Sequence, residues 1–259
     1  MKSYFTENTN FFENTNPEEL IEEFGSPLYV YNEKILRQRC REMADLISYP
    51  NFKSNYSIKA NSNLEILKIV RDEGLYADAM SPGEIYILML AGFKAEEIFF
   101  VSNNVSASEM KYAVDRGITV SCDSLSQLET FGRNFPGHKV AVRFNPGVGA
   151  GHHEKVVTGG KDTKFGVNID LVPEVKKIIN KYNLKLEGIN QHIGSLFMEP
   201  EAYVEGVKSL LKIAEQFDDL EFVDMGGGFG IPYRKQEGEA RLNLKKTGEM
   251  LDELIEAWT

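Results

Sequence analysis

The feature that most constrains the fold of this chain is a repeat of strand-like segments in its first half. Each segment is a short run rich in apolar, β-branched or aromatic residues, and each is followed by a stretch with the apolar spacing of a helix. The segments begin about every 21 residues, near Ser54, Tyr76, Glu97, Ile118 and Lys139. Because parallel strands need such crossover helices, the repeat predicts a β/α fold with a parallel sheet.

The helix-like stretches carry start signals of their own. A serine is followed three residues later by a glutamate or glutamine, the spacing of a capping box, in Ser81 with Glu84, Ser106 with Glu109 and Ser124 with Gln127. Outside the repeat, the same kinds of pattern predict strands over 28–31, 186–193 and 221–225 and helices over 17–24, 33–46, 172–182, 201–217 and 242–258.

Seven strands of the barrel type are therefore expected, and two architectures remain open. One is an open, doubly wound sheet, and the other is a TIM-type (β/α)8 barrel that is truncated before the eighth strand. We favour the incomplete barrel, because polar residues collect at the strand ends and barrels place their chemistry at the C-terminal ends of their strands.

The composition argues against several classes of function. With 26% charged and 42% hydrophobic residues the chain has a globular composition, and its net charge of −10 disfavours nucleic acid or an anionic membrane as a partner. Cys40 and Cys122 form no CxxC pair, and no apolar run approaches a membrane span or a signal peptide, so we expect a cytoplasmic location. His152 and His153 lack a carboxylate or cysteine at ligand spacing, so no metal site is predicted.

Polar or glycine residues stand at the ends of the predicted strands. They are Lys59, Asp78, Asn103 with Asn104, Asp123, Arg143 with Asn145, His192 with Ser195, and the run Gly226 to Gly230. A partly buried lysine amine loses its proton readily and can condense with a carbonyl, although a single lysine at a strand end usually extends into water. Each residue alone has a structural explanation. A lysine, an arginine, a histidine and an aspartate at one edge of a sheet together indicate a functional site.

The glycine run follows an apolar strand, so its backbone can approach a phosphate closely and direct several N–H groups at it. A Rossmann fingerprint is excluded, because the spacing is wrong and Pro232 and Tyr233 interrupt the helix that should follow. A Walker-type loop is excluded as well, because no Gly-Lys-Ser/Thr follows. A tight turn without a ligand is the alternative explanation of such a run.

Six motifs in order resemble those of the pyridoxal phosphate-dependent group IV decarboxylases, which have an alanine-racemase-like barrel. The motifs are YSIKAN at 56–61, DAMSPGE at 78–84, RFNP at 143–146, KFG at 164–166, HIGS at 192–195 and DMGGGFG at 224–230. Within that group they are most similar to the diaminopimelate decarboxylases. The resemblance covers nearly the whole chain from Ser26 onward.

The resemblance implies a role for each residue of the site. Lys59 would hold pyridoxal 5'-phosphate as a Schiff base and transfer a proton after carbon dioxide leaves, and His192 would stack on the cofactor ring. Asp78 and Arg143 would form a polar pair beside that ring. The phosphate would be held by Ser195, Gly226, Gly227, Gly228 and Gly230.

The implied reaction is the decarboxylation of a diamino acid, with meso-2,6-diaminopimelate as substrate and L-lysine as product. Residues 102–106 lack the lysine common there in diaminopimelate decarboxylases, which leaves D-lysine or D-ornithine as alternative substrates. A barrel that binds the cofactor without decarboxylation, or a decoy that no longer binds it, are alternatives from other classes. The family further implies a homodimer for the full-length form.

The chain departs from the family in what it lacks. The second domain, a β-sandwich with a Cys-Glu-Ser-Gly-Asp motif, and the Glu-Pro-Gly-Arg segment of the eighth strand are both missing from the sequence. We therefore expect a fragment with little turnover by itself. Residues 32–259 would form the incomplete barrel, and 1–31 would join the β-domain. Residues 147–160 resemble the family's mobile loop over the active site.

Overall fold

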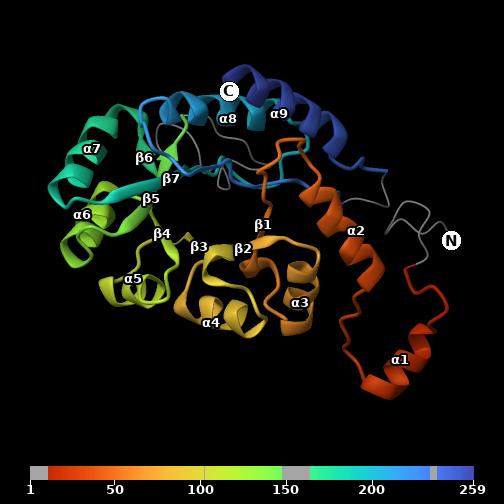
Figure 1. Ribbon diagram of the computed structural model, residues 1–259. Coiled ribbons are helices and arrows are strands. Elements are labelled where there is room, and N and C mark those ends of the chain that lie inside the picture. The colour runs from red at the N-terminus through yellow and green to blue at the C-terminus, as the bar shows by residue number, and fades with distance from the viewer. Residues whose placement is uncertain (1–10, 102, 148–163, 234–237) are drawn as a thin grey trace.

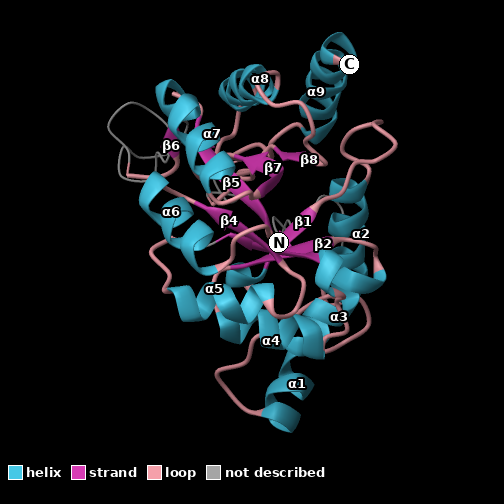
Figure 2. Cartoon of the chain, turned by 60° about the vertical axis from the view of Figure 1, so that its left-hand side comes forward, coloured by secondary structure: helices cyan, strands magenta, loops and turns pink. Residues whose placement is uncertain are grey.

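The chain folds into a curved parallel sheet with helices on its outer side (Figures 1 and 2). The computed structural model describes residues 11–101, 103–147, 164–233 and 238–259. The strands are β1 Asn55–Ser57, β2 Tyr76–Ala79, β3 Ile98–Val101, β4 Thr119–Cys122, β5 Lys139–Asn145, β6 Val167–Asn168, β7 Lys185–Asn190 and β8 Phe222–Asp224. The helices are α1 Pro17–Phe24, α2 Glu33–Ala44, α3 Leu64–Asp72, α4 Pro82–Leu90, α5 Ala107–Val114, α6 Leu125–Asn134, α7 Val172–Lys181, α8 Glu201–Ala214 and α9 Leu244–Trp258.

The strands follow the chain in the order β1-β2-β3-β4-β5-β7-β8, and all of these pairs are parallel. The five strands of the predicted repeat and both later strands are confirmed. The two-residue strand β6, which pairs with β5, was not predicted. It is too short to leave a period in the sequence.

Contacts across the interior show that the sheet curves as a barrel does. The Phe99 ring on β3 meets the Phe222 ring on β8 with centroids 5.3 Å apart, although these strands are not neighbours. Ser121 on β4 donates a hydrogen bond of 2.6 Å to Asn190 on β7, across the intervening β5. A flat sheet would hold such strands too far apart for side chains to touch. The barrel-type expectation is therefore confirmed for the part of the chain described, with β1 and β8 at the two ends of the strand order.

The main core lies between this sheet and the helices around it. Side chains with no exposed surface come from both layers, among them Ile58, Leu67, Phe100 and Phe131. Burying a side chain of this size contributes about 1.5–3 kcal/mol, so the two layers hold each other. The helix α9 packs on α8 and on the loop after α2, where Asp252 accepts a hydrogen bond of 2.7 Å from the Ser48 amide.

The helix starts follow the predicted serine caps, with a difference in detail. Ser106 and Glu109 form a reciprocal capping box at α5. At α4 and α6 the third residue after the serine bonds the residue before the serine instead of the serine itself. Glu84 accepts from the Met80 amide at 2.6 Å, and Gln127 accepts from the Asp123 amide at 2.8 Å. These two bonds tie the helix start to the strand end before it, and so fix the loops that carry the site.

The N-terminal segment differs from the prediction at residues 28–31, which form no strand. A strand needs a ladder partner, and the described residues offer none beside this segment. The helix α1 has no buried residue, and Figure 1 shows it standing apart from the sheet. Among the described helices, none is both long and apolar enough to cross a membrane.

Candidate active site

The predicted lysine lies just past the end of the first strand rather than on it. The strand β1 ends at Ser57, and Lys59 is the middle residue of a 3-10 turn, Ile58–Ala60. Ile58 is fully buried beneath the turn, whereas Lys59 is exposed. Lys59 therefore stands past the end of the strand, and its side chain is exposed.

The carboxyl of Asp78, at the end of β2, lies beside the first strand. The Ser57 hydroxyl donates a hydrogen bond of 2.8 Å to Asp78 Oδ1. Burial raises the pKa of Asp78 to about 7, and the Ser57 hydrogen bond and the positive charge of Lys59 oppose that rise. Asp78 and Lys59 are therefore close enough to affect each other's charge.

Arg143 pairs with a different carboxylate from the one predicted. Its Nη1 lies 3.2 Å from Asp123 Oδ1, and both side chains are nearly buried. The predicted pair of Arg143 with Asp78 is wrong, because β5 lies next to β4, which ends before Asp123, while Asp78 lies on β2. The register pairs Cys122 with Val142, so Asp123 and Arg143 come side by side one residue further on. The pairing thus follows from strand order and register together.

Asp123 is the centre of a wider hydrogen-bond network that was not predicted from the sequence. It accepts from the Gly166 amide at 3.3 Å and from the Asn103 side chain, in addition to its ion pair with Arg143. The guanidinium of Arg143 also lies over the Phe165 ring, 5.0 Å from its centroid. The network thus joins the ends of three strands to the Lys164-Phe165-Gly166 motif.

His192, which follows β7, belongs to the same group of charges. Burial, together with the positive charges of Arg143 and Lys59, lowers the pKa of His192 to about 4. The ring is therefore uncharged at neutral pH. Burial raises the pKa of Asp224 on β8, and the positive charge of Arg143 opposes that rise.

The glycine turn lies against the segment that carries His192 and Ser195. A Cβ at Gly226 would come within 2.2 Å of the Gln191 carbonyl oxygen, and one at Gly228 within 2.1 Å of the Gly194 carbonyl oxygen. Only glycine allows these approaches, and Gly230 is crowded in the same way, with Phe197 O at 2.4 Å. Gly227 differs, because a Cβ there would meet nothing within 4 Å. Ser195 is exposed and directly follows Gly194, whose carbonyl lies against Gly228.

The structure thus brings the predicted residues to one end of the sheet. Lys59, Asp78, Arg143 and His192 interact electrostatically, and the glycine turn lies beside His192. The loop prediction for residues 147–160, with His152 and His153, falls almost wholly outside the described residues. Within those residues, no cluster of three or more histidine, cysteine or acidic side chains could hold a metal ion.

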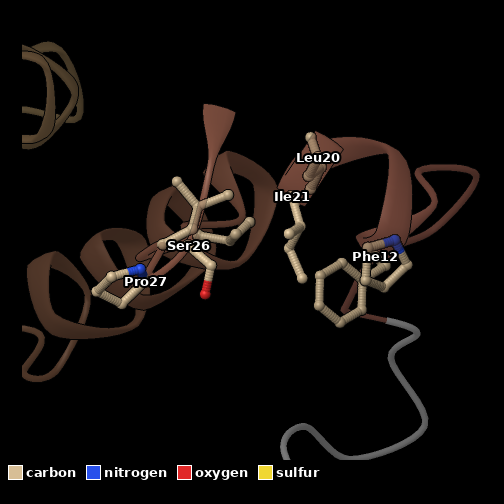
Figure 3. A pocket seen from close by; sticks show the side chains of 8 residues that line it. Phe12, Leu20, Ile21, Ser26 and Pro27 are labelled. Carbon is tan, nitrogen blue, oxygen red and sulfur yellow. The ribbon is translucent and has the colours of Figure 1, made fainter. Parts of the chain in front are cut away.

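A separate hollow lies in the N-terminal segment (Figure 3). Residues between Phe12 and Val30 line it, and its walls include Phe12, Leu20, Ile21, Ser26 and Pro27. The residues that line it carry no charge, and none comes from a strand end. It therefore offers no acid, base or nucleophile beyond one serine, and the strand-end group remains the candidate active site.

Comparisons with known proteins agree with this geometry. The family model described as "Pyridoxal-dependent decarboxylase, pyridoxal binding domain" matches residues 33–258. A diaminopimelate decarboxylase of Methanothermobacter thermautotrophicus is 39% identical over 249 residues, which cover 92% of this chain and 58% of that protein. The diaminopimelate decarboxylase of Escherichia coli K12 is 32% identical over 229 residues, 86% of this chain and 52% of that protein.

The fold has a close counterpart among solved structures. The crystal structure of diaminopimelate decarboxylase from Helicobacter pylori complexed with L-lysine aligns with a TM-score of 0.85 at 29% identity. The alignment covers 93% of this chain and 63% of that one. The chain therefore spans little more than half the length of the curated relatives named above.

Proposed function

Because the chain belongs to the pyridoxal-dependent decarboxylases and carries their pyridoxal-binding domain, we propose that its strand-end site serves the decarboxylation of a diamino acid. The observation that carries the proposal is the grouping of an accessible lysine, a neutral histidine and an arginine–carboxylate pair beside a glycine turn. This set provides an amine for attachment, a flat uncharged ring and a place for a phosphate.

The residues present fit pyridoxal 5'-phosphate. Lys59 offers an exposed amine for covalent attachment, and His192 offers a flat ring without charge. Ser195 and the backbone around Gly227, where the structure leaves open space, would hold the phosphate group. The bound cofactor supplies the electron sink for the electron pair left when carbon dioxide departs.

The side chains of the site would divide the remaining work among them. Lys59 Nζ holds or delivers a proton, and Asp78, with its pKa raised to about 7, can exchange a proton at its carboxyl beside that amine. Arg143 is held in place by Asp123 and keeps positive charge next to His192. That charge favours the neutral imidazole, which would offer the cofactor ring a flat side chain without charge.

For the substrate we propose meso-2,6-diaminopimelate, with L-lysine as the product. The support is the set of relatives named diaminopimelate decarboxylase, one of which was crystallised with L-lysine. D-lysine or D-ornithine remains the second candidate. In its favour, Asn103 stands in the stretch where the family commonly has a lysine, and here its side chain bonds Asp123.

We also propose how this chain is placed in a larger protein. The exposed apolar side chains of Ile21, Phe24, Tyr29 and Tyr31 support residues 1–31 as the part that packs on the family's second domain. The free, buried thiols of Cys40 and Cys122 support a reducing cytoplasm. A homodimer of the full-length form rests on the family resemblance alone.

The test of the proposal is a covalent trap. The purified chain is incubated with pyridoxal 5'-phosphate and reduced with borohydride, and the modified peptide is mapped by mass. We expect a phosphopyridoxyl group on Lys59 and none there in Lys59→Arg, which keeps the positive charge. A folded chain that is modified only at other lysines would refute the site.

The reaction itself is tested by carbon dioxide release. We expect the chain alone to release little from meso-2,6-diaminopimelate, and a polypeptide extended by the family's C-terminal part to release more. An extended form active on D-ornithine or D-lysine but not on diaminopimelate would favour the second candidate. An extended form that carries the Lys59 adduct and decarboxylates none of the three would leave a binding domain only.

A further inference from the structure

We propose that Tyr203 is a positioning residue for the phosphate of the cofactor, because its hydroxyl holds the carbonyl of the peptide between Gly226 and Gly227 in the glycine turn. Tyr203 lies on α8, outside the sheet, and takes no part in the site described above. The inference rests on the proposed cofactor binding and deepens it.

The first observation is that the carbonyl groups of Met225, Gly226 and Gly228 accept hydrogen bonds from α8 and from the segment after β7. The Tyr203 hydroxyl donates to the Gly226 carbonyl at 2.8 Å, and Gln191 Nε2 donates to the Met225 carbonyl at 3.2 Å. The Phe197 amide donates to the Gly228 carbonyl at 3.0 Å. The turn is thus attached by its oxygens.

The second observation concerns the amides of the same peptides. In a trans peptide the C=O and the following N–H point in opposite directions. Anchoring the Gly226 carbonyl therefore aims the Gly227 N–H away from α8, and anchoring the Gly228 carbonyl aims the Phe229 N–H away from the Phe197 amide. Within the part of the chain that the structure describes, neither of these two amides has a hydrogen-bond acceptor.

The third observation is that the space beside Gly227 is open. A Cβ on Gly227 would meet no atom within 4 Å, whereas Gly226 and Gly228 are in contact with the chain itself. Successive N–H groups that face open space form a concave site for an anion. The amide of Gly226 is already used, because it donates to Asp224 Oδ1 at 2.8 Å.

Tyr203 is built to hold this position. Its side chain is almost wholly buried, and its ring stacks on Phe197 with centroids 4.8 Å apart and contacts Phe229 at 5.2 Å. Burial raises the pKa of Tyr203, so the hydroxyl keeps the proton that it donates. Because the ring is held by its neighbours, the hydroxyl is a fixed donor.

The experiment compares two ligands that differ only in the phosphate. Binding of pyridoxal 5'-phosphate and of pyridoxal is measured by the extent of borohydride-trapped modification of Lys59 against ligand concentration. In Tyr203→Phe, which keeps the ring, we expect the affinity for pyridoxal 5'-phosphate to fall about fivefold, the size expected for one lost hydrogen bond, and the affinity for pyridoxal to stay unchanged. Amide hydrogen exchange over 225–230 should also become faster in this variant.

The matched control is Tyr182→Phe, which removes a tyrosine hydroxyl that bonds Glu129 at 2.6 Å, far along the chain from the turn. It should leave both affinities unchanged. If Tyr203→Phe does not fold, Gln191→Met removes the neighbouring anchor, and the preference for the phosphorylated ligand should fall less, because Asp224 also holds that peptide.

The outcomes separate the two proposals. A wild-type chain that modifies Lys59 with neither ligand counts against the cofactor site itself, and the role of Tyr203 falls with it. A wild-type chain that prefers pyridoxal 5'-phosphate, with the same preference in Tyr203→Phe, overturns the role of Tyr203 and leaves the cofactor site standing. Equal loss of both affinities would show a structural role only.

Discussion

The ion pair between Asp123 and Arg143 should be costly to break and inexpensive to replace. The two side chains are 11% and 8% exposed, and Nη1 lies 3.2 Å from Oδ1. Burial raises the pKa of Asp123 and lowers the pKa of Arg143, so for both groups the loss of water outweighs the attraction of the partner. Removing one partner leaves the other charge buried without compensation.

The size of the loss follows from this burial. Removing one partner of a buried pair costs about 3–5 kcal/mol. For Asp123→Asn we expect the lower end, about 3 kcal/mol, because Asp224 still attracts Arg143 and the asparagine keeps an acceptor for the Gly166 amide. For Arg143→Met we expect a similar loss. The double variant should lose less than either single variant, since no uncompensated charge then remains.

The assay is urea unfolding of the four forms at pH 7, followed by circular dichroism. A coupling of about 2 kcal/mol or more between the two substitutions is expected. Effects that add within about 0.5 kcal/mol would refute the reasoning, because sites that add independently do not share a buried interaction. Glu201→Gln, which breaks the exposed pair with Lys246, is the matched control and should shift the midpoint far less.

The glycine turn and two titrating groups of the site carry the remaining predictions. Gly228→Ala should lose about 3 kcal/mol in urea unfolding, because its φ is +107° and a Cβ would lie 2.1 Å from Gly194 O, whereas Gly227→Ala should unfold near the wild-type midpoint. The ring signals of His192 should titrate in NMR near pH 4. Since an unfolded histidine titrates near pH 6.5, the stability of the wild type relative to His192→Gln should rise between pH 4 and 6.5, and a midpoint near 6.5 would contradict this. The folded chain holds a proton on Asp78 up to about pH 7, while the unfolded chain loses it near 3.8, so stability relative to Asp78→Asn should fall as pH rises through this window, and a constant difference would speak against the raised pKa.

The fold could be predicted because it depends on local patterns. The strands near Tyr76, Ile118 and Lys139 and the helix caps at Ser81 and Ser106 each follow from a period or a spacing that a few residues contain. The segment 28–31 was mispredicted as a strand, because its residues have strand propensity but no ladder partner among the described residues. Strand propensity is a property of the residue itself, whereas strand pairing depends on the rest of the molecule.

The sequence predicted which residues stand together at the strand ends, and not which of them touch. The residues at the strand ends come together because parallel strands end at one edge, whichever residues follow. Which carboxylate meets Arg143 depends on strand order and register, and Asp78 and Asp123 are equivalent choices until those are known. The exposure of Lys59 likewise depends on a 3-10 turn that begins one residue after the strand, a boundary that sequence patterns do not fix.

The glycine turn shows why a motif can have a structural and a functional explanation at once. Gly226, Gly228 and Gly230 are required by the chain's own backbone, because a side chain at any of them would collide with residues 191–198. These three would be glycine even if nothing ever bound. In the turn they permit, however, the Gly226 carbonyl is held by Tyr203 on α8, so the Gly227 amide points away from α8 at a residue where a Cβ would meet no atom within 4 Å. The close packing that explains most of the glycines is therefore also what creates the place for an anion.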